Sequence, residues 1–365
     1  MRARPVLPVL ALAAAAAVLV APPASAAPPQ PACGDTLTVD TALRADLTCL
    51  AGPGLRLAAG VTLDLRGHTL RGPGDGVGVE VASAGAVRVR NGTVTGWGAG
   101  LRTYGVEDAG TGPLTVDRMR FRDNVDGLDV SATQLGEWAK PTTITRSTVT
   151  GSSDAAVEAA WSVPVTIDRT TLADNRFGLR ADGGDTVVTG SRFLRHERAI
   201  SVYEGSVDVR DTAFDDNATG ITAASVAVVT VAGSRFTGSE TAVDGSWAFL
   251  DVAGSRFTAN TTAVLIGTYG ASVDGSTFRA NGTGVALGTP AGTGSVTGNV
   301  FRLNGDGIRL DPGDAGIEVG GNDVRRSTGW GIYAPGVTDL GGNVARGNGN
   351  EPQCVGVVCD GTPQS

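Results

Sequence analysis

A repeat of fixed length constrains the fold of this chain more than any other feature of its sequence. Four residues at fixed spacings recur as a set about 21 residues further on. The first set is Val252, Phe257, Asn260 and Val264, and the second is Val273, Phe278, Asn281 and Val285. Nothing between them has helical periodicity. Such a chain stacks each unit against its neighbours instead of folding around one central core, so we expect one elongated domain.

Each repeat contains three short apolar segments. An apolar residue is followed five positions later by a second, as at Val231 and Phe236, and about seven residues beyond comes a small residue with an aliphatic one, as at Ala242-Val243. Three short strands joined by bends, at a period of about 21 to 28 residues, predict an all-β, single-stranded parallel β-helix of about twelve to thirteen coils. A leucine-rich repeat has a similar period, but its consensus and its helical segment are missing.

Polar residues recur at fixed positions of the repeat. Serine, threonine or asparagine precedes the second apolar anchor by two positions, as at Ser234 and Ser255, and asparagine often follows it by three, as at Asn260 and Asn281. Parallel stacking places equivalent residues about 4.8 Å apart. We therefore expect ladders of these side chains that hydrogen-bond along the axis and satisfy backbone groups at the bends.

The first residues have the pattern of a secretory signal. Arg2 and Arg4 precede an apolar run, and Ala24-Ser25-Ala26 supplies small residues before a predicted cleavage after Ala26. The run is too short for a membrane span, and no later stretch approaches about 18 apolar residues. The sequence thus predicts a secreted protein, extracellular or in the cell envelope, that is monomeric and has no membrane span. We expect a signal peptide over 1–26, an N-terminal lead and cap over 27–60, the β-helix over 61–336, and a C-terminal cap and tail over 337–365.

The charge of the chain disfavours nucleic acid as a partner. The formal net charge is −8, and loss of Arg2 and Arg4 with the signal would take it to −10. Nucleic-acid binding requires a basic surface. An acidic glycan would need a local basic cleft or a bridging cation. The sequence identifies no cofactor: calcium is compatible with Asp215-Asp216-Asn217, but no motif indicates it, and no metal site is predicted.

The four cysteines lie in pairs near the two ends, as Cys33 and Cys49 and as Cys354 and Cys359. Three pairings are possible. Export favours oxidation, and local pairing would fix each end of the array, where a solenoid otherwise exposes an unpaired coil. The alternative is a four-cysteine metal site. We favour two local disulfides, because the ends of a solenoid lie far apart.

Two segments carry a family resemblance. Val61 to Leu70, with the sequence VTLDLRGHTL, and Arg90-Asn91-Gly92-Thr93-Val94, preceded by Cys33 and Cys49, resemble secreted bacterial right-handed parallel β-helix proteins of the pectin-lyase-like superfamily. They are also similar to periplasmic β-helix proteins of the NosD type, which assist metal-site assembly. The resemblance covers the whole mature chain and implies a right-handed β-helix with capped ends. Family members include polysaccharide lyases, glycoside hydrolases, epimerases and proteins without known activity, so it does not specify a reaction.

In this family the working cleft lies on the outward face of the strand that contains the small-aliphatic pair. The residue after each aliphatic points outward by strand alternation. Near the N-terminal end these outward residues are Arg102, Asp129, Glu158 and Arg180. Asp129 and Glu158 are expected about 4.8 Å apart at the backbone, close to the roughly 5 to 5.5 Å between the carboxyl groups of retaining glycosidases.

We assign catalytic roles to Asp129, Glu158 and Arg180 as a hypothesis. Two carboxyl groups so close cannot both ionise easily, so one would serve as a general acid while Arg180 stabilises charge. Residues of the same face, of two long adjacent connections and of the loop that follows them are predicted to bind substrate: Arg102, Tyr104, Trp138, Trp161, Asp182 and Tyr203. The alternative is a surface ladder of alternating charge, with Trp138 and Trp161 covering apolar surface.

The sequence therefore favours a protein that binds a polysaccharide or cell-wall glycan. If it is an enzyme, polysaccharide lyase or glycoside hydrolase activity is expected. A non-catalytic extracellular or cell-wall binding module is a second hypothesis, because no recognised catalytic signature is present. An accessory protein of the metal-site assembly type is a third.

Overall fold

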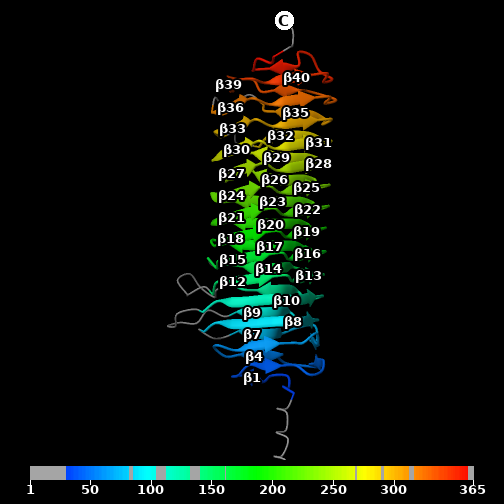
Figure 1. Cartoon of the computed structure of the whole chain (residues 1–365), viewed down its shortest axis with the longest axis vertical. Coiled ribbons are helices and arrows are strands. Elements are labelled where there is room, and N and C mark those ends of the chain that lie inside the picture. Colours follow the sequence, from blue (N-terminus) through cyan, green and yellow to red (C-terminus); the bar gives the residue numbers. More distant parts are fainter. Residues whose placement is uncertain are drawn as a thin grey trace, which may run out of the picture. The chain divides into compact units, whose positions relative to one another are not determined.

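The computed structural model describes residues 30–81, 85–103, 112–131, 140–160, 162–267, 269–288, 292–311 and 316–360. The chain divides into two units, Met1–Gln30 and Pro31–Ser365. The signal peptide predicted over 1–26 lies outside the described residues. All regular elements of the described part are β-strands, and they wind upward turn by turn within the second unit (Figure 1). The described part of the chain contains no helix with the length and hydrophobicity of a membrane span.

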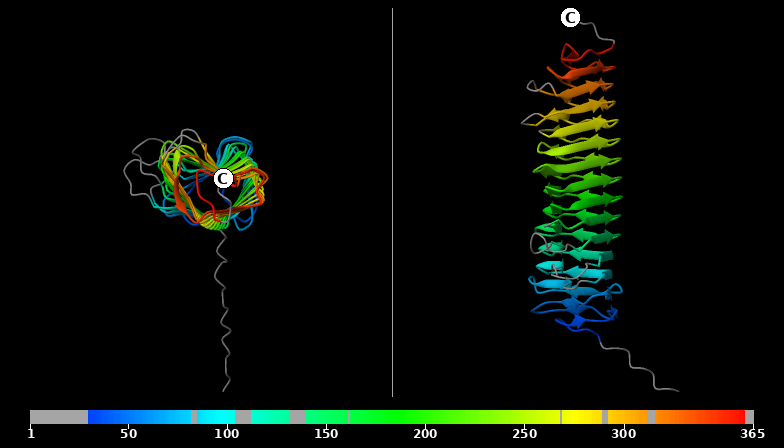
Figure 2. Two further views of the ribbon diagram at one scale, coloured as in Figure 1. Left: turned by 90° about the horizontal axis from the view of Figure 1, so that it is seen from above. Right: turned by 90° about the vertical axis from the view of Figure 1, so that its left-hand side faces the viewer.

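Most turns contribute one strand to sheet A and two to sheet B, so that three faces enclose the interior (Figure 2). Among the described residues sheet A contains 15 strands in sequence order. They are β1 (Thr36–Leu37), β4 (Leu55–Leu57), β7 (Val77–Val81), β9 (Ala99–Thr103), β11 (Asp126–Asp129), β14 (Ala155–Ala159), β17 (Phe177–Asp182), β20 (Arg198–Tyr203), β23 (Thr219–Ala224), β26 (Thr241–Gly245), β29 (Thr262–Ile266), β32 (Thr283–Leu287), β35 (Asp306–Arg309), β38 (Ile332–Tyr333) and β41 (Cys354–Val355).

Sheet B has two files of strands that meet at a bend, and two long strands, β8 (Val87–Thr95) and β10 (Leu114–Arg122), run through both files. The first file also contains β2 (Thr41–Ala42), β5 (Thr62–Asp64), β12 (Thr142–Thr145), β15 (Val165–Asp168), β18 (Asp185–Thr189), β21 (Ser206–Arg210), β24 (Ala227–Ala232), β27 (Ala248–Ala253), β30 (Gly270–Asp274), β33 (Gly294–Thr297), β36 (Ile317–Gly320) and β39 (Thr338–Gly341). The second file contains β3 (Leu47–Thr48), β6 (Thr69–Arg71), β13 (Thr148–Thr150), β16 (Thr171–Ala173), β19 (Arg192–Leu194), β22 (Ala213–Asp215), β25 (Arg235–Thr237), β28 (Arg256–Thr258), β31 (Thr277–Arg279), β34 (Val300–Arg302), β37 (Asp323–Arg325) and β40 (Val344–Arg346).

The strand register confirms the predicted parallel β-helix. Equivalent anchors are direct partners on successive turns, as with Val231 and Val252 in β24 and β27. The described pairings are parallel, because every turn runs in the same direction as the one below it. Strand pairing also extends beyond 61–336 on both sides, since β1 pairs with β4 and β38 pairs with β41.

A stack of phenylalanine rings fills the interior beside the second file of sheet B. Neighbouring rings lie 4.4 to 5.0 Å apart between centroids, with interplanar angles of 10° or less. All of these rings are buried. They belong to Phe193, Phe214, Phe236, Phe257, Phe278 and Phe301. The predicted alignment of equivalent anchors in one buried file is thus confirmed.

Two ladders of polar side chains form hydrogen bonds with backbone groups at the bends. The backbone N–H of Ser255 donates to Oγ of Ser276 on the next turn at 3.0 Å. Asn260 accepts a hydrogen bond at Oδ1 from the N–H of Ser239 (2.9 Å) and donates from Nδ2 to the carbonyl of Phe236 (3.2 Å). These side chains are buried. Each therefore connects turns and pairs backbone groups that no strand uses.

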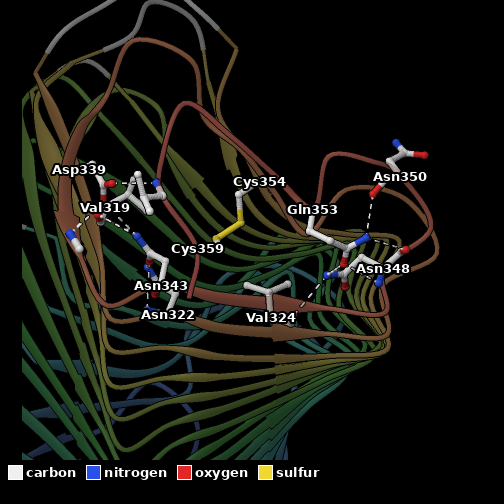
Figure 3. The surroundings of a disulfide bond; sticks show 12 residues. Val319, Asn322, Val324, Asp339, Asn343, Asn348, Asn350, Gln353, Cys354 and Cys359 are labelled. Atoms are coloured by element: carbon white, nitrogen blue, oxygen red, sulfur yellow. Dashed lines mark hydrogen bonds between the residues drawn. A yellow bond between two sulfur atoms is a disulfide. The ribbon is translucent and has the colours of Figure 1, made fainter. Parts of the chain in front are cut away.

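Both ends carry local disulfides, which confirms the favoured pairing. Cys33 is bonded to Cys49, and Cys354 to Cys359. At the C-terminal end Gln353 closes the asparagine ladder (Figure 3). Its Oε1 accepts from the backbone N–H of Asn348 at 2.9 Å, and its Nε2 donates to the carbonyl of Asn350 at 3.0 Å. Gln353 thus pairs polar groups of the last turn among the described residues.

Candidate functional site

A column of charged residues runs along the outward face of sheet A. In register order it contains Arg102 on β9, Asp129 on β11, Glu158 on β14 and Arg180 on β17. The predicted neighbour relation of Asp129 and Glu158 is confirmed, because they are direct partners in the parallel pairing of β11 with β14. Their chemical roles stay a prediction. We call these four residues the charged column.

Each acidic residue of the charged column bonds an arginine on an adjacent turn. Nε of Arg102 donates to Asp129 at 2.8 Å, and Nε of Arg180 donates to Glu158. The same pattern occurs below the column, where Arg56 bonds Glu80 at 3.0 Å. Alternation of charge is broken only once within the column, where Asp129 lies directly beside Glu158.

Two further aspartates surround this break, and the sequence analysis missed them. Asp126 lies in β11, three residues before Asp129, and Asp154 directly precedes β14. Nη2 of Arg180 donates to Asp154 at 3.2 Å, so this arginine bridges Asp154 and Glu158. A signal for Asp126 was present in the sequence, because the residue before the small-aliphatic pair is polar in most turns, as at Asp126 and Thr241.

Burial governs the protonation of Glu158. Its side chain is 17% exposed. Burial raises the pKa of Glu158 to about 7, and the nearby charges of Asp126 and Asp129 add to the rise, while Arg180 opposes it. Desolvation of the charged form is therefore the main cause, not the repulsion by Asp129 that the sequence suggested. Burial also raises the pKa of Asp126.

An aromatic ring packs against Arg180 and two neighbouring arginines. Phe177 is buried in β17, and the guanidinium carbons of Arg176 and Arg180 each lie 5.1 Å from its ring centroid, with that of Arg198 at 5.8 Å. Attraction between a cation and the ring face restricts the positions of these side chains. Arg180 is thus held from one side by Phe177 and from the other by two carboxyl groups.

Comparison with known proteins agrees with this fold. A family model described as a right handed beta helix region matches residues 77–247. The chain is a right-handed β-helix protein. That stretch includes the entire charged column. No curated protein sequence matches the chain significantly.

Several solved structures are similar to this β-helix protein. One is the catalytic unit of an alpha-1,3-glucanase from Streptomyces thermodiastaticus, with 16% identity over 87% of this chain and 63% of that chain and a TM-score of 0.45. Another is gene product 12 of bacteriophage phi29, with 13% identity, coverages of 88% and 53% and a TM-score of 0.40. A tailspike of E. coli bacteriophage HK620 has 12% identity, coverages of 89% and 64% and a TM-score of 0.37. The chain thus spans less than two thirds of each of these structures.

The remaining predicted site residues fall into two groups. Asp182 and Tyr203 are direct partners at the ends of β17 and β20, two positions beyond Arg180 and Ser201, and Tyr203 is 52% exposed. Tyr104, Trp138 and Trp161 lie outside the described residues, as do 104–111 and 132–139 in the two long connections. Within the described ranges, no group of three or more His, Cys, Asp or Glu side chains is arranged to hold a metal ion.

Proposed function

We propose that this β-helix protein is exported, acts as a monomer, and binds a polysaccharide or cell-wall glycan on the outward face of sheet A, where it hydrolyses a glycosidic bond. The observation that carries the proposal is the direct pairing of Asp129 with Glu158 on adjacent strands of that face. A parallel strand spacing of about 4.8 Å lies near the roughly 5 to 5.5 Å between the two carboxyl groups of retaining glycosidases.

The surroundings of the two carboxyl groups suit different roles. Glu158, half-protonated near neutral pH because its pKa is about 7, is suited to donate a proton to the glycosidic oxygen as the bond to the anomeric carbon breaks. Asp129, held by Arg102, is suited to attack that carbon. Water then releases the sugar from Asp129 and returns a proton to Glu158, so both groups are restored. Arg180 orients Glu158 through its hydrogen bond.

A binding module without catalysis is the second candidate. It is favoured by the arginine contacts, since Asp129 and Glu158 each have a guanidinium partner. Such pairs offer polar groups to which sugar hydroxyl groups can hydrogen-bond, and exposed Tyr203 adds an aromatic face. This candidate predicts affinity for a glycan without turnover.

Asp129→Asn and Glu158→Gln test the proposal against neutral and acidic glycans. We expect release of reducing ends by the unmodified protein and a loss of about 10² to 10⁴ in kcat/KM in either variant, the range that proton transfer contributes. Asp323→Asn is the matched control, because Asp323 is also a half-buried carboxylate bonded to arginine but lies on sheet B. It should keep full activity.

The pH profile gives a second readout. Because Glu158 must carry a proton, kcat should fall as pH rises through about 7, the pKa of that residue in the fold. Glycan binding without any turnover by the unmodified protein would favour the binding module instead. An equal loss in Asp323→Asn would contradict a role specific to the charged column.

A further inference from the structure

The bend between the two files of sheet B is hollowed near the N-terminal end. A cavity of about 350 Å³ is lined there by Gly67, Asn91, Gly92, Arg118, Met119, Arg120, Arg146 and Thr148. We call this surface the arginine bend, because Arg118, Arg120 and Arg146 are its charged residues. It lies between the two sheet B files, whereas the charged column lies on sheet A.

A close approach of the backbone to the core at Gly92 contributes to the hollow. Gly92 is the register partner of Met119 on the next turn. A Cβ at Gly92 would lie 2.2 Å from Cβ of Leu65, so the backbone there sits too close to the core for any larger residue. On the next turns Arg118 and Arg146 adopt positive φ angles of 53° and 49° at the bend, and their side chains are about half exposed. The surface therefore recedes at Gly92 beside projecting arginines.

The arginine bend has more positive than negative charge. Asp117 is shared by Arg118 at 3.1 Å and Arg146 at 2.6 Å. A guanidinium carries five N–H donors, so both arginines retain donors for another acceptor. One carboxylate is thus paired with two arginines at this bend, although the chain as a whole is acidic.

Arg120 is the arginine of this bend that no described acidic residue neutralises. Its register partners are Thr93 on one side and Thr148 on the other, which are hydroxyl residues. Among the described residues, Arg120 has no acidic partner. By contrast, Arg192 and Arg235, which lie further along the same sheet, both bond Asp215 at 2.9 and 3.4 Å. Exposed arginines of this protein are often neutralised by a neighbour, and Arg120 departs from that pattern at a concave position.

We propose that the arginine bend is a binding site for an oxyanion, with Arg120 as its principal contact and Arg118 and Arg146 as supporting donors. Planar guanidinium groups match carboxylate, sulfate and phosphate oxygens through paired N–H donors. The same chemistry would accept a free inorganic anion or the acidic group of a charged oligosaccharide. The site is independent of the proposed hydrolysis, since it shares no residue with the charged column.

Calorimetric titration with inorganic phosphate, a galacturonate trisaccharide and a neutral glucose trisaccharide tests the site. We expect the unmodified protein to bind at least one anion and Arg120→Gln to weaken that binding about tenfold or more. Arg120→Lys should fall between them, because it keeps the charge but loses the paired donors. Affinity should also fall as salt rises, since the site is open to solvent. Phosphate binding alone would identify a free anion as the ligand, and galacturonate binding an acidic glycan.

Arg256→Gln is the matched control. Arg256 lies in the second file of sheet B, as Arg120 does, is exposed, and has no acidic partner among the described residues. It should bind either anion within twofold of the unmodified protein. An equal loss in both variants, full retention in Arg120→Gln, or no binding of either anion would overturn the proposal. Asp129→Asn should leave the binding of inorganic phosphate unchanged, which separates this site from the glycan site on sheet A.

Discussion

His196 shows how a single residue can replace another in a ladder by reproducing its hydrogen bonds. It occupies an asparagine position between Asn175 and Asn217 and is buried. Nδ1 lies 3.3 Å from the backbone nitrogen and 3.0 Å from the carbonyl oxygen of Asn175, and Nε2 lies 3.0 Å from the carbonyl oxygen of Leu172. A neutral imidazole has one donor nitrogen and one acceptor nitrogen, as an asparagine amide has one donor group and one acceptor group.

Acid should therefore destabilise the fold through His196. Burial lowers the pKa of His196 below its usual value of 6.5, so the unfolded chain takes up a proton more readily than the folded one. The stabilisation is complete above about pH 6.5, the unfolded value, and declines as pH falls toward the lower value in the fold. His196→Asn should lose less stability than the unmodified protein between pH 7.5 and 5, measured by urea unfolding. Parallel pH dependences for the two proteins would contradict this account.

Stacking of buried phenylalanine rings helps to hold successive turns together. Phe257 lies between Phe236 and Phe278 at centroid distances of 5.0 and 4.9 Å, with no exposed surface. Each ring thus contacts its equivalents above and below. Removing one ring opens a cavity that neighbouring turns cannot close, because their backbones are fixed by the strand pairing on both sides.

Phe257→Ala should lower the free energy of unfolding by about 3 to 5 kcal/mol, the usual effect of deleting a buried ring. Phe249→Ala is the control, since Phe249 is 45% exposed on the outer face of β27. The two variants compare the same chemical change inside and outside the coil, and urea unfolding measures both. A loss in Phe249→Ala as large as that in Phe257→Ala would show that stacking in the interior is not the cause.

The sequence predicted elements better than it predicted the site, and the reason is physical. Anchors such as Phe257 and Asn260 recur at the period of the coil, so their partners follow from counting. Counting also placed Asp129 beside Glu158. It does not give the direction of a long side chain, so the bridging of Asp154 by Arg180 was missed. Nor does it give burial, which is the main cause of the raised pKa of Glu158.

For the whole molecule, the ends are the regions with the fewest neighbours. In the described part of the chain, an inner turn packs against a turn on each side and an outermost turn packs against one, so the stability of the repeat array should decrease toward its ends. The disulfides Cys33–Cys49 and Cys354–Cys359 lie at these positions. Gln353 adds side-chain hydrogen bonds at the C-terminal end (Figure 3).

Removal of one disulfide should loosen only its own end. The double substitution of Cys33 and Cys49 by serine should speed amide hydrogen exchange in β1 and β4, while β26 and β29 keep their protection, because neighbouring turns interact only locally. The corresponding change at Cys354 and Cys359 should affect β38 and β41 alone. Mass spectrometry of exchanged peptides resolves the two regions. Uniform acceleration throughout the array would indicate that the disulfides act on global unfolding instead.

The parallel pairing of successive turns also gives the β-helix a constant rise per turn. Each turn adds one strand spacing, about 4.8 Å, along the axis. The distance along the axis between the charged column and the Cys354–Cys359 disulfide therefore depends on the number of intervening repeats. Duplication or deletion of a whole repeat, such as the one that begins at Val252, would change that distance without changing the residues of the charged column or of the disulfide.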